Sequence, residues 1–219
     1  MFRLLLNIHI VAGTIALVVA PLAMAVVKGG VWHRRWGKLY FWMMAVVAVT
    51  SAGMCYLRSG LFLFLIAIFS FYLALTGYRA LRRKAPGDRA TVIDWSSALI
   101  MLVAAAALFI RALLAGNLAD RWIPALFGGI GLFLAVEQIF HFLKPPADPR
   151  AWLYAHMTRF LAAYIATVSA FSVVNFTFLP PIWRWLWPAI LGTFVIILWR
   201  KRYEKSSRPV PEKRTPISG

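Results

Sequence analysis

Residues 28–40 read KGGVWHRRWGKLY, a short cationic stretch that separates two long apolar runs. Lys28, Arg34, Arg35 and Lys38 surround His33, whereas residues 4–27 and 39–57 contain no Lys, Arg, Asp or Glu. An apolar run of about 20 residues is long enough to cross a hydrocarbon layer of about 30 Å as a helix. The pattern is typical of two transmembrane helices joined by a cationic loop.

The same alternation continues along the whole chain of 219 residues. The sequence is 62% hydrophobic and 14% charged, with a mean hydropathy of +0.74. A single soluble core cannot cover so much apolar surface. We therefore predict an all-α integral membrane bundle with seven transmembrane helices, at about 3–27, 38–57, 60–79, 95–115, 122–143, 152–178 and 182–200. Residues 1–200 form one transmembrane domain in this interpretation.

The distribution of Lys and Arg predicts the orientation of the bundle. With the N-terminus outside, the cytoplasmic segments carry 18 of these residues and the outer segments carry five. This asymmetry favours an outside N-terminus and a cytoplasmic C-terminus. Residues 1–25 also imitate a cleavable signal peptide, but their apolar run is longer than the 7–15 residues typical of one.

The last segment, residues 201–219, is basic and rich in proline, so we expect a disordered cytoplasmic tail. Its Lys and Arg residues predict contact with anionic lipids at the surface of the bilayer. The net charge of +17 is split into short clusters between apolar spans, so membrane topology explains it better than nucleic-acid binding does.

Ionisable residues inside predicted spans are the candidates for a functional site, because each is costly to insert. Glu137 and His141 share a helix face near the cytoplasmic edge, since positions four apart are neighbours on a helix. His156 and Arg159 occupy a similar depth on the next span, and His33 belongs to the same side. The hypothesis is a cytoplasm-facing ligand or cofactor site; the alternative is a neutralised buried network that only fixes helix packing.

His9 is a second candidate, on the outer side, where it shares a face with small residues that favour close helix packing. Hydrogen bonding to its neighbours is the plainer interpretation of this residue. If the protein binds haem, His141 and His156 are the expected axial ligands, because their depths match. The other functions left open are an electron-transfer protein, a transporter, and a membrane assembly or structural partner without a ligand site.

Three segments carry a resemblance to a known family: HIVAGTIAL from His9, KGGVWHRRWGKLYFW from Lys28 and FYLALTGYRAL from Phe71. They resemble a family of bacterial multi-pass membrane proteins known as domain of unknown function 2306. The resemblance implies a helical bundle in the bacterial cytoplasmic (inner) membrane. It implies no reaction, substrate, cofactor or site residues.

Overall fold

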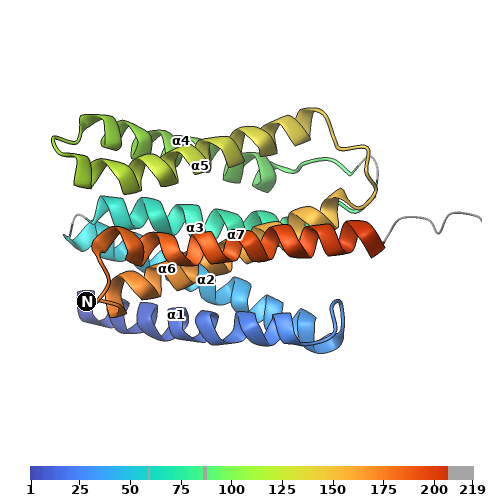
Figure 1. Ribbon diagram of the computed structural model, residues 1–219, viewed down its shortest axis with the longest axis horizontal. Helices are drawn as coiled ribbons and strands as arrows, with labels where there is room; N and C mark the ends of the chain where they lie inside the picture. The colour runs from blue at the N-terminus through green and yellow to red at the C-terminus, as the bar shows by residue number, and fades with distance from the viewer. Residues whose placement is uncertain (59, 86–87, 207–219) are drawn as a thin grey trace, which may run out of the picture.

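The computed structural model describes residues 1–58, 60–85 and 88–206, and these form seven α-helices without a strand. All seven helices are long and apolar enough to cross a membrane, which confirms the predicted fold class. Helices suit this environment because each backbone amide finds its partner inside its own segment. The helices are α1 (Phe2–Ala25), α2 (Val31–Arg58), α3 (Leu61–Ala80), α4 (Val92–Leu114), α5 (Leu118–Leu143), α6 (Ala151–Asn175) and α7 (Pro181–Ser206) (Figure 1).

The largest departure from the predicted boundaries is at the start of α2. We predicted this span from residue 38, but the helix begins at Val31, so His33, Arg34, Arg35 and Lys38 lie on its first turns. The connection to α1 is correspondingly short, and Gly29 turns the chain there with a positive φ of 75°.

Two further boundaries differ near the C-terminus. α6 ends at Asn175 rather than at 178, and α7 continues to Ser206, six residues beyond the predicted span. The beginning of the predicted tail is therefore helical, while residues 207–219 lie outside the described residues.

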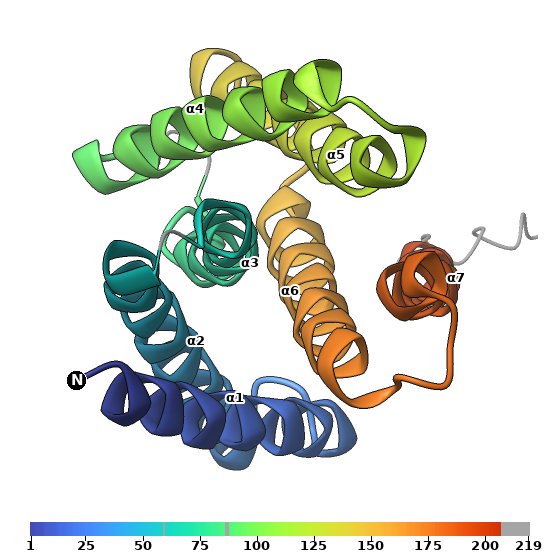
Figure 2. The same cartoon turned by 90° about the vertical axis from the view of Figure 1, so that its left-hand side faces the viewer.

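The helices pack as two hairpins around a central pair (Figure 2). α1 pairs with α2 and α4 pairs with α5, while α3 packs against α6 between them and α7 packs against α6. Half of the apolar window of α3 is buried inside the bundle, compared with 6% of that of α7. α3 is thus the central helix, and α7 presents most of its surface to the surrounding membrane.

Small side chains allow the central helices to approach closely, as is usual for helices packed in lipid. Ala16, Ala74, Ala105, Ala135 and Ala163 are almost completely buried and come from five different helices. Larger core residues such as Tyr40, Leu73 and Met101 fill the spaces between them.

The connections α1–α2, α3–α4 and α5–α6 all lie at one end of the bundle, together with the end of α7 (Figure 1). We call this end, formed by residues 26–38, 79–85, 88–94, 137–159 and 199–206, the cationic end. It gathers most of the lysines and arginines of the described chain, and it is the end that the sequence predicts to be cytoplasmic.

Candidate functional site

An ion pair between α5 and α6 forms the deepest part of the candidate site. Arg159 Nη2 donates to Glu137 Oε2 at 2.6 Å. The Arg159 side chain is 8% exposed, whereas that of Glu137 is 36% exposed. Two of the predicted site residues therefore meet, and the carboxylate remains accessible while the guanidinium is buried.

The buried Arg159 guanidinium has one nitrogen without a partner. Its Cζ atom lies 5.8 Å from the ring centre of Tyr72, whose hydroxyl donates to the Leu134 carbonyl oxygen at 3.1 Å. Arg159 Nη1 is buried and makes no hydrogen bond. An unsatisfied charged donor in such a position is costly, so it suits an acceptor supplied from outside the chain.

The imidazoles of His33 and His156 lie close together between α2 and α6, whereas the ion pair joins α5 to α6. His33 comes from α2 and His156 from α6, and their ring centres are 6.3 Å apart with the planes inclined by 74°. The His156 ring also lies 4.9 Å from that of Phe160, one turn further along α6. The bundle thus unites two histidines that are separated by 123 positions in the sequence.

A backbone carbonyl orients each of these two rings. His33 Nδ1 is 2.9 Å from the Ala23 carbonyl oxygen, and His156 Nδ1 is 2.9 Å from the Gly77 carbonyl oxygen. Because a carbonyl only accepts hydrogen bonds, Nδ1 must carry the proton in both cases. When the ring is neutral, Nε2 is left as a lone-pair donor, as in histidines that bind a metal or accept a proton.

His141 does not join this group. Its ring packs against Phe140, with 6.3 Å between ring centres, and it makes no hydrogen bond within the described part of the chain. Glu137, one turn away on the same helix, bonds to Arg159 instead. The ring next to that of His156 is therefore that of His33. The sequence had suggested His141 in this position.

His9 lies towards the opposite end, and its Nδ1 atom has local partners. Its Nδ1 is 3.0 Å from Thr50 Oγ1 and 3.4 Å from Ser51 Oγ, both on α2. The Thr50 hydroxyl donates to the Val46 carbonyl, so its oxygen accepts the proton of His9. These contacts join α1 to α2 and give His9 a packing role.

A second buried ion pair joins α3 to α4. Arg79 Nε donates to Asp94 Oδ1 at 3.0 Å, and Arg79 Nη2 donates to Asp94 Oδ2 at 2.6 Å. Asp94 also accepts the Thr91 amide in a capping box at the start of α4. The spacing T-x-x-D before an apolar run, at Thr91–Asp94, is the signal that identifies this cap in the sequence.

Arg83 is the site residue that the sequence analysis missed. Its guanidinium lies 4.8 Å from the ring centre of Phe142, and its Nε atom is buried without a hydrogen-bond partner. Burial lowers the pKa of Arg83, with a smaller opposing effect of Asp94. The guanidinium nevertheless stays protonated, because its ordinary pKa is far above neutrality.

The cationic end therefore holds more buried positive than negative charge. Asp94 neutralises Arg79 and Glu137 neutralises Arg159, whereas Arg83 forms no ion pair within the residues described. Arg83 Nε and Arg159 Nη1 are buried and have no hydrogen-bond partner among the described residues. No cluster of three or more His, Cys, Asp or Glu residues that could hold a metal ion occurs in the described ranges. The arrangement favours a ligand with an anionic group.

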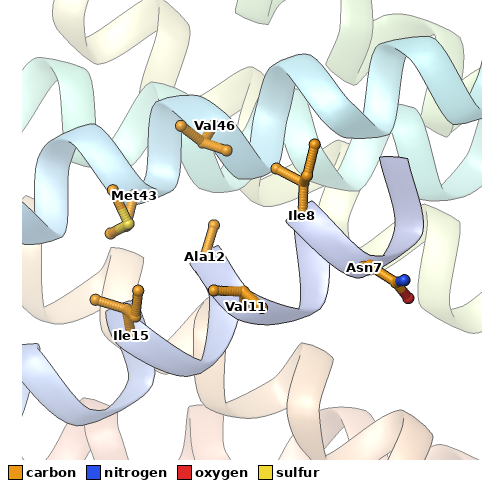
Figure 3. A pocket seen from close by; sticks show the side chains of 7 residues that line it. All are labelled: Asn7, Ile8, Val11, Ala12, Ile15, Met43 and Val46. Atoms are coloured by element: carbon orange, nitrogen blue, oxygen red, sulfur yellow. The ribbon is translucent and has the colours of Figure 1, made fainter. Parts of the chain in front are cut away.

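A groove between α1 and α2 has a different chemistry (Figure 3). It measures about 430 Å³, and its lining is apolar except for Asn7; the other lining residues are Ile8, Val11, Ala12, Ile15, Met43 and Val46. It offers no charged group to a substrate and is suited to an acyl chain of the membrane.

Comparison of the chain with models of protein families, with curated proteins and with solved structures finds no match. The functional argument therefore depends on the geometry described above.

Proposed function

We propose that this multi-pass membrane protein resides in the bacterial inner membrane and binds a small acidic ligand or cofactor at its cationic end, on the cytoplasmic side. The excess of Lys and Arg at that end supports the orientation. The resemblance of the His9, Lys28 and Phe71 segments to a bacterial membrane family supports the location.

The observation that carries the proposal is the oriented pair His33 and His156. Two imidazoles are fixed through Nδ1 with their ring centres 6.3 Å apart, and each neutral ring keeps an Nε2 lone pair for a ligand. Arg83 adds a positive charge that no carboxylate of the described residues neutralises. A ligand with a carboxylate or phosphate group would compensate this charge, while its remaining polar atoms would meet the imidazoles.

The test is to identify small molecules that co-purify with the protein. The protein is expressed in a bacterium, purified in a mild detergent and denatured, and the released compounds are identified by mass spectrometry. We expect an acidic compound at close to one equivalent from the wild type, and its loss from His33→Ala and His156→Ala.

His9→Ala and His141→Ala are matched controls, because each removes an imidazole outside the pair. Both should retain the compound. Equal retention in all four variants, or release of nothing except membrane lipid, would contradict the proposal.

Haem is a second candidate ligand, and a specific observation favours it. Histidines that ligate a metal commonly donate their other ring nitrogen to a carbonyl, as His33 and His156 do. Haem also carries two carboxylates that would suit the unpartnered guanidinium nitrogens. In this case His33 and His156 would be the axial ligands of an electron-transfer protein.

An absorbance spectrum of the purified protein tests haem binding directly. A Soret band that is lost in His33→Ala and His156→Ala, but kept in His141→Ala, is the expected result. Protein that is colourless after expression with a haem precursor, and negative in a pyridine haemochrome assay, would exclude haem and leave the acidic-ligand proposal intact.

A further inference from the structure

A separate pocket is lined by residues from the turn between α1 and α2 and from the last turns of α7. Both segments lie at the cationic end of the bundle (Figure 1). The pocket measures about 350 Å³ and is lined by Lys28, Trp199, Arg202 and Tyr203. Two of these side chains are cationic, two are aromatic, and none is acidic. The pocket therefore has the composition of a binding site for an anion.

The chain fixes the Lys28 ammonium group at this position. Lys28 Nζ donates to the Met24 carbonyl oxygen and, at 3.3 Å, to that of Val26, both at the end of α1. The same nitrogen lies 5.5 Å from the ring centre of Trp199 on α7. A positive charge held in place in this way loses little freedom when it binds an anion, which favours affinity.

The surroundings of the pocket indicate which anion it receives. Trp199 and Tyr203 are residues that prefer the level of the lipid headgroups. On the membrane-spanning parts of the same two helices, α1 exposes Val18 and Leu22, and α7 exposes Val195, one turn before Trp199. A molecule with a phosphate group and acyl chains can contact both the cations and these apolar helix surfaces.

We propose that this pocket binds the phosphate group of an anionic phospholipid. Lys28 and Arg202 contact the phosphate, Trp199 and Tyr203 lie beside the headgroup, and the acyl chains follow α1 and α7. This inference is independent of the ligand proposed for His33 and His156, because the two sets of residues do not overlap.

The test uses the full chain, delipidated in detergent and titrated with phosphatidylglycerol while bound lipid is counted by native mass spectrometry. Each Lys or Arg near an anionic lipid contributes about 1 kcal/mol, so Arg202→Gln should weaken the tightest binding about fivefold. The double variant Lys28→Gln with Arg202→Gln should weaken it about 30-fold. Arg202 is exposed at the end of a helix, so the single variant should fold even if loss of Lys28 disturbs the turn.

The control is Arg3→Gln with Arg111→Gln, which removes the same charge from two exposed residues at the opposite end. It should bind phosphatidylglycerol as the wild type does. Equal weakening in the control, or no weakening in Arg202→Gln, would overturn the proposal.

Glycerol phosphate distinguishes a lipid site from a site for free phosphate. At concentrations equal to those of phosphatidylglycerol it should not displace the lipid, because it lacks acyl chains. Displacement at equal concentration would overturn the lipid assignment and identify a soluble phosphate compound as the ligand.

Discussion

Arg79 and Asp94 show how single residues stabilise the cationic end. Their side chains are 8% and 2% exposed, and two hydrogen bonds join them. Forming a buried ion pair is close to neutral for stability, because desolvation of the charges offsets their attraction. Removing one partner is strongly unfavourable, because the other charge is then buried alone.

We therefore expect Asp94→Asn to lower the free energy of unfolding by about 3–5 kcal/mol. The substitution leaves the Arg79 guanidinium uncompensated and weakens the cap of α4. Reversible unfolding of the purified protein in mixed detergent measures the loss.

Asp148→Asn is the control, because Asp148 pairs with Arg150 at 3.5 Å and both side chains are 43% exposed. Exposed pairs of this kind contribute about 0–1 kcal/mol. Similar losses in the two variants would show that burial does not set the contribution of the Arg79–Asp94 pair.

The sequence predicted which residues of the candidate site lie inside the spans, but it did not predict all of the contacts between them. The cost of inserting charge singled out Glu137 and Arg159, and the structure joins them. The neighbour of His156 could not be inferred, because it depends on how α2 and α6 are rotated and placed. No local pattern in the sequence records that arrangement.

In the α4–α5 hairpin, two adjacent glycines on α5 differ in how closely the neighbouring helix approaches them. A Cβ atom at Gly128 would lie 2.8 Å from the Phe109 backbone nitrogen and 3.0 Å from the Ala105 carbonyl oxygen. A Cβ atom at Gly129 would meet nothing within 4 Å. Gly128 therefore permits the close approach of the two helices, and Gly129 does not contribute to it.

We expect Gly128→Ala to destabilise the protein by about 1–3 kcal/mol, because backbone atoms of α4 must move to accommodate the methyl group. Gly129→Ala should instead stabilise it by about 0.5–1 kcal/mol through the higher helix propensity of alanine. Thermal unfolding in detergent, followed by circular dichroism, distinguishes the two. A stabilising Gly128→Ala would contradict the packing described for this hairpin.

The number of helices was predictable because each span is a long apolar run, and lipid allows few alternatives. The start of α2 was not, because the cluster at 33–38 was interpreted as a loop. Arg and Lys are good helix formers, so a helix can continue beyond the hydrocarbon layer when its charged turns reach water. α7 continues through Arg200, Lys201 and Arg202 for the same reason.

For the whole molecule, an odd number of spans predicts that the start of α1 and the end of α7 lie on opposite sides of the membrane. The excess of Lys and Arg at the cationic end predicts that Gly219 is cytoplasmic. A green fluorescent protein fused after Gly219 should fluoresce, and alkaline phosphatase at the same position should be inactive. The reverse pattern would contradict the orientation and move the proposed site to the outer face.

The order of packing was not predictable from the sequence. Consecutive helices pair in α1–α2 and α4–α5, but the central position of α3 and α6 depends on contacts between distant segments. Gly77 on α3 illustrates this, since a Cβ atom there would lie 2.6 Å from a ring atom of Phe160. The fit between Gly77 and Phe160 can be recognised only when the positions of α3 and α6 are known.

The length of α2 links the proposed ligand site to the lipid headgroups of the bilayer. Its 28 residues extend about 42 Å at 1.5 Å per residue, well beyond a hydrocarbon layer of about 30 Å. The apolar run at 39–57 accounts for only about 28 Å of this length, so the first turns of α2 protrude beyond the hydrocarbon layer. His33 lies on these turns, at the level of the lipid headgroups, and we expect the affinity for its ligand to depend on the headgroups of the host membrane.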